Sequence, residues 1–236
     1  MRNGVKSILR ALGYELRRLP GSAAPQEPTR DLDHLRLREC AKAMQSVKLH
    51  FGCGPRVLKG WINIDLAYEP YEAYMRYYTD EFYGESVRGT RDDFFAFDIT
   101  KVGLPLPDNS VDVIFHEDFI EHLDQKSQVV FLAETLRVLR PDAVHRVNTP
   151  NLLEAMKLQS RFSEGIRGVF VEEWEKHGHK SILTPKSLEE LALMVGYSRV
   201  IFTSRDQSRS PLLPKEYRPD HRDRPAEGNV FADLIA

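Results

Sequence analysis

The sequence has little cysteine, almost no net charge and no long apolar run. Its 236 residues include only two cysteines, Cys40 and Cys53, and no Cys/His cluster with zinc-finger spacing. This excludes the disulfide framework of a small secreted protein and a structural zinc site. The 33 basic residues against 35 acidic ones leave a net charge of −2, so no global field attracts nucleic acid. No apolar run reaches the ~18 residues of a membrane span, and no signal-peptide pattern is present. We therefore expect a cytoplasmic protein with no nucleic-acid partner.

Residues 1–19 carry five basic residues and one acidic residue around an apolar stripe. The stripe has helical spacing and consists of Val5, Ile8, Leu9, Leu12 and Leu16. We expect a basic amphipathic helix at the inner face of a membrane, on a partner protein, or on its own domain. Residues 20–29 have the Pro, Gly, Ser and Ala content of a linker. The predicted division is therefore a helix plus linker over 1–30 and one main domain over 31–236.

Strand and helix patterns alternate along the main domain. Seven strands are predicted, at 47–51, 61–65, 94–99, 111–116, 143–148, 200–203 and 229–235. Helices are predicted at 31–45, at 126–139 with Pro141 as its stop, and at 185–195 between the N-cap Thr184 and Gly196. This alternation predicts an α/β fold with a single Rossmann-like, doubly wound, mainly parallel seven-stranded sheet.

Glycines and acids follow the first three predicted strands. Gly52 and Gly54 lie directly after the first strand, where the backbone can approach a ligand without a Cβ in the way. Asp65 ends the second strand, where a carboxylate can accept both hydroxyls of a ribose, and Asp98 lies near the end of the third. These strand ends meet at one edge of a parallel sheet and predict a nucleoside site. A dinucleotide site is disfavoured, because the third glycine is missing and the first crossover is short.

The ordered motifs resemble class I S-adenosylmethionine-dependent methyltransferases, in particular bacterial members associated with surface-polysaccharide biosynthesis. The similar segments are 49–54, 60–65, 98–99, 104–112, 121–123, 136–141 and 149–151. One departure is Asp142-Ala143, where relatives usually have two glycines. The resemblance implies S-adenosylmethionine as cofactor, with its amino-acid part over Gly52–Gly54, its ribose on Asp65 and its adenine near Asp98 and Ile99. The predicted donor-binding set is Phe51, Gly52, Cys53, Gly54, Asp65, Leu66, Asp98, Ile99 and His116.

The resemblance suggests methylation of an oxygen on a sugar or glycan precursor. Methylation of a small natural product or a lipid would use the same donor site. A third alternative is an inactive donor-binding partner subunit of a glycosyltransferase, which would dock through residues 1–19.

Candidate catalytic residues follow the fourth predicted strand. His116, Glu117 or His122 would act as a general base on an acceptor hydroxyl, whose high pKa makes proton removal useful. The alternatives are that His122 packs against the next helix, that Glu121 orients its neighbours, and that catalysis depends on alignment of the two substrates.

Two further groups are predicted to contact the acceptor. His177 and His179 precede the helix at 185–195, and Tyr71 and Tyr74 belong to an aromatic cluster after the second strand. A solvated loop and ordinary packing are the respective alternatives. Two histidines two residues apart also suggest a metal, but no third ligand can be assigned from the sequence. The sequence therefore predicts no metal site.

Overall fold

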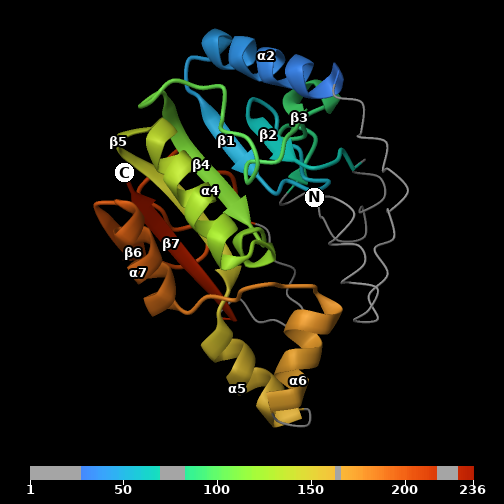
Figure 1. Ribbon diagram of the computed structural model, residues 1–236, viewed down its shortest axis with the longest axis vertical. Helices are drawn as coiled ribbons and strands as arrows, with labels where there is room; N and C mark the ends of the chain where they lie inside the picture. Colours follow the sequence, from blue (N-terminus) through green and yellow to red (C-terminus); the bar gives the residue numbers. More distant parts are fainter. Residues whose placement is uncertain (1–27, 70–82, 163–165, 217–227) are drawn as a thin grey trace, which may run out of the picture.

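The computed structural model describes residues 28–69, 83–162, 166–216 and 228–236, and its centre is a seven-stranded sheet (Figure 1). The strand order is β3-β2-β1-β4-β5-β7-β6. The strands are β1 Lys48–Phe51, β2 Ile62–Asp65, β3 Phe94–Ala96, β4 Val111–Glu117, β5 Leu139–Pro150, β6 Arg199–Phe202 and β7 Asn229–Ile235. Only β7 runs antiparallel to its neighbours β5 and β6. The predicted fold class is confirmed.

Three helices cover one face of this sheet: α2 Pro28–Ala43, α4 Gln125–Val138 and α7 Pro185–Val195. Each buries apolar side chains in one core, such as Leu37, Leu132 and Leu188. The bounds of α7 agree with the prediction because its ends are encoded locally. The Thr184 hydroxyl accepts a hydrogen bond from the backbone N–H of Ser187, and Gly196 ends the helix at φ 120°.

Several predicted boundaries differ from the observed ones, among them those of α2, β3, α4 and β5, and two of the differences have local reasons. Helix α4 ends at Val138 and β5 begins at the next residue, so Pro141 lies inside a strand and does not stop the helix. Strand β3 ends at Ala96, before Asp98. The Asp98 carboxylate accepts a hydrogen bond from the backbone N–H of Thr100 at 3.1 Å, which stabilises a turn.

The opposite face of the sheet is covered by loops in the described part of the chain. The connection between β1 and β2 contains no helix, and its Leu58 and Trp61 pack on Phe115 of β4. Arg146 of β5 is fully buried and forms ion pairs with Glu216 at 2.8 Å and with Asp233 of β7 at 3.1 Å. These ion pairs attach the loop at 203–216 to the sheet.

One group of helices was not predicted from the sequence. Helices α5 (Leu152–Phe162) and α6 (Ile166–Phe170) extend beyond the end of β5, and the π-helix η4 (Val171–Lys176) follows them (Figure 1). The chain then returns to the sheet edge at His179. There the backbone N–H of Lys180 donates a hydrogen bond to the main-chain carbonyl of Glu121 at 2.8 Å. In the described ranges, no helix combines the length and apolar character needed to cross a bilayer.

Candidate functional site

A cavity of about 670 Å³ lies where the chain leaves β1, β2 and β4. Its position at the carboxyl ends of parallel strands, beside the switch from β1 to β4, is the usual ligand site of an open α/β sheet. Part of the predicted donor-binding set lines this cavity: Phe51, Gly52, Asp65, Leu66, Asp98 and Ile99. The structure thus brings together six residues that the sequence distributes over three strand ends.

Gly52 permits the close packing of the first turn. It has φ 58°, and its N–H donates to the carbonyl of Ile64 at 2.9 Å. A Cβ at this position would lie 2.5 Å from the ring of Phe119, so only glycine lets Phe119 cover the turn. Phe119 was not predicted, because nothing in the linear sequence indicates this approach.

Asp65 joins the end of β2 to the glycine turn. One carboxylate oxygen accepts from the backbone N–H of Gly54 at 2.8 Å, and the other accepts from Leu66 at 2.6 Å. Burial raises the pKa of Asp65, and these two hydrogen bonds oppose the rise. The carboxylate is therefore held in a fixed orientation in the cavity wall.

Asp98 lines the same cavity from the turn after β3. Burial alone would raise its pKa, but hydrogen bonds from Lys101 and Thr100 outweigh burial and lower it. The ammonium group of Lys101 lies 2.6 Å from the carboxylate. Asp98 therefore remains ionised, and the backbone around Ile99 is fixed beside it.

Cys53 and Gly54 do not line the cavity. The side chain of Cys53 is buried with Val57 and Phe94 on the loop-covered side of the sheet, and this burial raises the pKa of its thiol. Strand β1 ends at Phe51 and the chain turns at Gly52 with φ 58°, so Cys53 does not continue the alternation of the strand and faces away from the core that buries Phe51. The predicted donor contacts of Cys53 and Gly54 are corrected accordingly.

His116 lies in the core rather than in the cavity. Its ring is fully buried and packs against Phe119, Phe131 and His145. Burial lowers its pKa to about 3, with a further contribution from the charge of His50. The structure therefore corrects the predicted roles of His116 as base and as donor ligand, because its ring is fully buried in the core and does not line the cavity.

Glu117 lies on the other face of the sheet, since it is adjacent to His116 in β4. It pairs with the buried guanidinium of Arg56, and Asn148 donates to its carboxylate at 3.3 Å. Glu117 is not part of the cavity wall. Glu117 is therefore not placed to act as a base. It instead pairs with Arg56 and so holds the β1–β2 loop against the sheet.

His122 is the one predicted catalytic residue in the cavity wall. It ends the 3₁₀ turn η3 (Ile120–His122), is exposed, and lies beside the ring of His179 with centroids 4.9 Å apart. Its pKa is lowered by partial burial and by the neighbouring His179. The neutral ring is thus the main form near pH 7.

The predicted acceptor contacts divide into three groups. Tyr71 and Tyr74 lie outside the described residues. His177 is exposed, lies 3.1 Å from the Glu172 carboxylate, and is not in the cavity wall. His179 is buried beside Glu173 and Glu121, next to the cavity. Of the two described histidines, His179 is the one whose ring lies directly beside that of His122.

Residues 49–147 match the methyltransferase domain family. The matched segment runs from β1 into β5 and contains the strands that form the cavity. A probable S-adenosylmethionine-dependent methyltransferase of Mycolicibacterium smegmatis is 54% identical over 48 residues, which span 20% of this chain and only 18% of that relative. These similarities support an S-adenosylmethionine-dependent methyltransferase with S-adenosylmethionine as its cofactor.

Solved structures of methyltransferases have a similar fold. A methyltransferase of Archaeoglobus fulgidus is 15% identical, with a TM-score of 0.49, and the match covers 88% of this chain and 94% of that one. A methyltransferase of Mesorhizobium loti is 13% identical, with a TM-score of 0.49, and the match covers 82% of this chain and 92% of that one. The strand order established above, rather than these similarities, defines the fold.

Proposed function

We propose that the protein transfers the methyl group of S-adenosylmethionine to a hydroxyl oxygen of a sugar or glycan precursor. The observation that carries this proposal is the polar rim of the cavity beyond the donor-binding residues. The rim consists of Asp118, His122, Asp124, Ser127 and Lys180. Such a rim offers hydrogen-bond donors and acceptors to a polyhydroxylated acceptor. The similarity of the motifs to polysaccharide-associated methyltransferases supports the same class.

The transfer would depend chiefly on alignment. If the donor binds over Gly52 with its ribose on Asp65, an acceptor held by the polar rim could reach the methyl group. The acceptor oxygen forms a bond to the methyl carbon while the carbon–sulfur bond of the sulfonium breaks. Holding both groups in line supplies much of the rate enhancement. His122 is the predicted residue placed nearest to such an acceptor.

The expected product is an acceptor heavier by one methylene group. Sugar nucleotides, lipid-linked oligosaccharides, free fatty acids and phenols would each be incubated with the protein and donor, and analysed by mass spectrometry. We expect the mass gain only in sugar-containing acceptors, with one S-adenosylhomocysteine per methyl group. A gain confined to the phenols or fatty acids would contradict the proposal. No turnover with any acceptor would instead support an inactive partner subunit of a glycosyltransferase.

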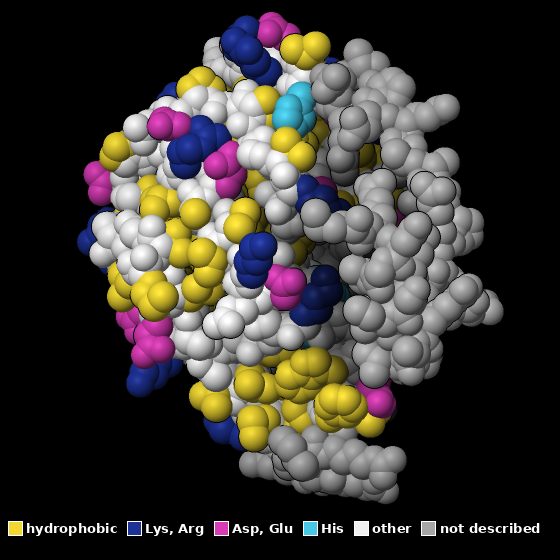
Figure 2. All heavy atoms as spheres, viewed as in Figure 1, with side chains coloured by type: hydrophobic (Ala, Val, Ile, Leu, Met, Phe, Trp, Pro, Cys, Tyr) yellow, Lys and Arg dark blue, Asp and Glu magenta, His cyan; other side chains and the backbone are white. Residues whose placement is uncertain are grey.

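A patch of exposed apolar side chains favours a second candidate acceptor, one that carries a lipid. Hydrophobic side chains gather over α5 and α6 at the lower end of Figure 2. The exposed members there are Leu153, Met156, Phe170 and Val171. Because an apolar patch of this kind often marks a binding surface, an acceptor with an apolar carrier would suit it. In the assay above, lipid-linked oligosaccharides would then react faster than the matching sugar nucleotides.

The predicted helix at 1–19 lies outside the described residues, and we propose that it binds the inner face of an anionic membrane from the cytoplasm. Deletion of residues 1–29 should release the protein from anionic vesicles in a pelleting assay, and added salt should do the same to the intact chain. Donor affinity should be unchanged, because the donor residues begin at Phe51. If the deletion instead lowers the melting temperature and the intact chain never pellets, the helix packs on its own domain.

A further inference from the structure

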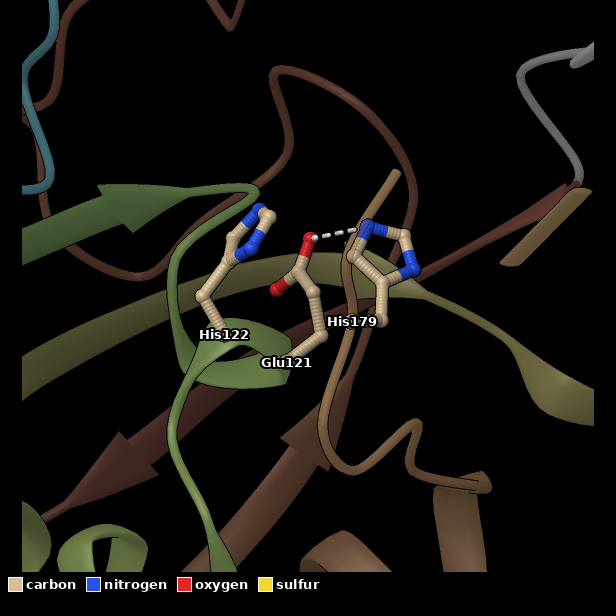
Figure 3. A group of neighbouring side chains, drawn as sticks. All are labelled: Glu121, His122 and His179. Atoms are coloured by element: carbon tan, nitrogen blue, oxygen red, sulfur yellow. Dashed lines mark ion pairs between the residues drawn. The ribbon is translucent and has the colours of Figure 1, made fainter. Parts of the chain in front are cut away.

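Three ligand-bearing side chains converge beside the cavity, and we propose that they bind a divalent transition-metal ion. The three are Glu121, His122 and His179 (Figure 3). One ligand atom of each lies within 4.8 Å of the other two, and Nε2 of His179 is 4.0 Å from Oε1 of Glu121. Figure 3 shows the Glu121 carboxylate between the two imidazole rings. The sequence predicted no metal because it paired His179 with His177, whereas the fold pairs it with Glu121 and His122.

The surrounding groups orient these side chains as they do in metal sites. Nδ1 of His179 lies 3.0 Å from Oε2 of Glu173, a buried carboxylate on η4. A carboxylate there takes the Nδ1–H and directs the lone pair of Nε2 toward Glu121, which is the usual arrangement behind a metal-bound histidine. The hydroxyl of Thr149 donates to Oε2 of Glu121 at 2.9 Å. The Oε1 atom then faces His179.

The backbone fixes the two segments that carry the ligands. The N–H groups of Lys180 and Ser181 both donate to the carbonyl of Glu121, at 2.8 and 3.1 Å. The side-chain amide of Gln128 donates to the carbonyl of Ile120 at 3.0 Å. The backbone segments that carry Glu121 and His179 are therefore held side by side whether or not an ion is bound.

The donor set indicates the class of metal. Two imidazoles and one carboxylate suit Zn²⁺, Mn²⁺ or Fe²⁺, whereas Mg²⁺ and Ca²⁺ prefer oxygen ligands alone. Ligand atoms about 2.1 Å from a tetrahedral ion lie roughly 3.4 Å apart. Binding of an ion therefore requires the Glu121 and His179 side chains to approach from 4.0 Å by small side-chain rotations, and the exposed His122 ring to rotate toward them. Three protein ligands leave at least one coordination position of the ion open. Because His122 lines the cavity, this open position would face the cavity.

The role of the ion rests on the function proposed above. An acceptor hydroxyl in an open coordination position would have a lowered pKa. Its O–H bond breaks with release of the proton to solvent, and the oxygen attacks the methyl carbon as the carbon–sulfur bond breaks. His122 then acts as a ligand of the ion rather than as a base. The competing explanation is that His179 only pairs with the carboxylates of Glu121 and Glu173, with no ion bound.

The test measures metal binding to the full-length chain without any acceptor. After treatment with EDTA and desalting, Zn²⁺ and Mn²⁺ are titrated by calorimetry, and Co²⁺ by visible absorption. We expect one ion per chain. The substitutions Glu121→Gln, His122→Ala and His179→Ala should each weaken binding by at least about tenfold, and Glu173→Gln by about 10- to 100-fold.

The matched control is His177→Ala, which removes an exposed histidine whose ring stacks on His179 with centroids 5.6 Å apart but which is not one of the three ligands, so it should change the affinity much less than His179→Ala does. S-adenosylmethionine binding by each variant, measured alongside, reports that the domain is folded. Because His122 is exposed, its variant stays informative even if Glu121→Gln unfolds. Absence of binding by all three ions, or equal losses in His177→Ala and His179→Ala, would overturn the proposal. Metal binding without methylation of any sugar would leave this site standing and refute only the proposed acceptor class.

Discussion

Replacement of Asp65 by alanine is expected to weaken S-adenosylmethionine binding by about 10- to 100-fold. The carboxylate would accept both ribose hydroxyls, and loss of a charged acceptor of this kind costs about 1.5–3 kcal/mol. Both of its oxygens already accept backbone hydrogen bonds, from Gly54 and Leu66. Each oxygen has a second lone pair, so the ribose does not have to displace these bonds. Calorimetric titration of the donor measures the effect.

A matched control distinguishes loss of a direct contact with the donor from a general effect of removing a carboxylate. Asp108 also carries a carboxylate, but its side chain is 69% exposed, pairs with Arg137 and lies outside the cavity wall. Asp108→Ala should therefore leave donor affinity unchanged. The variant Asp65→Asn keeps one carbonyl acceptor and should bind with intermediate affinity. A folded Asp65→Ala protein with the affinity of the original chain would refute the assignment of Asp65 to the ribose.

The elements that were predicted well have signals that are local in the sequence. Helix α7 has its N-cap, its first-turn proline and its terminal glycine within the segment itself. Gly52 and Asp65 follow short apolar strands, and parallel pairing brings the ends of β1 and β2 together. The convergence of these residues at one edge of the sheet could therefore be predicted without coordinates.

The incorrect predictions around β4 concern His116 and Glu117, whose orientations follow from the alternation of side chains along a strand. His116 is two residues after Ile114, which faces the helix-covered core, so both side chains point to the same face. Glu117 must then face the other side. A residue's position at the end of a strand does not by itself place it in the ligand site.

The cluster of Glu121, His122 and His179 could not be predicted from spacing. It depends on the unpredicted excursion through α5, α6 and η4, which returns the chain to the sheet edge and supplies Glu173 behind His179. A long-range pairing of this kind has no periodic signal. The same holds for Arg146, whose partner Glu216 lies on an irregular loop.

Three buried histidines lead to the second main prediction, that the protein loses stability steeply in mild acid. Burial lowers the pKa of His50 and of His116 to about 3, with smaller contributions from the charges of Arg56 and His50 respectively. Burial beside His116 also puts the pKa of His145 well below its usual value. In the unfolded chain these rings titrate near their ordinary value of ~6.5. Between about pH 6.5 and pH 3 the unfolded state therefore binds more protons than the folded state.

This difference in proton binding sets the sign of the effect. The free energy of unfolding rises with pH wherever the unfolded state binds more protons, so it must fall as the pH drops below about 6.5. Each such histidine contributes roughly 1 kcal/mol per pH unit within that window. Carboxylates whose pKa is lowered in the folded state, such as Asp98, add losses at lower pH. A variant that removes a single histidine is needed to separate the two contributions.

His116→Leu provides this variant, because neither ring nitrogen of His116 has a hydrogen-bond partner in the described part of the structure. Its ring faces Phe119, Phe131 and His145, so leucine replaces it among largely apolar neighbours. Urea unfolding followed from about pH 7.5 to about pH 4.5 should give a shallower decline in stability for the variant, by roughly 1 kcal/mol per pH unit. The control Phe131→Leu disturbs the same cluster without removing a titrating group, so it should lower stability equally at every pH. Parallel declines for His116→Leu and the original chain would show that His116 titrates alike in the folded and unfolded states, contrary to its burial.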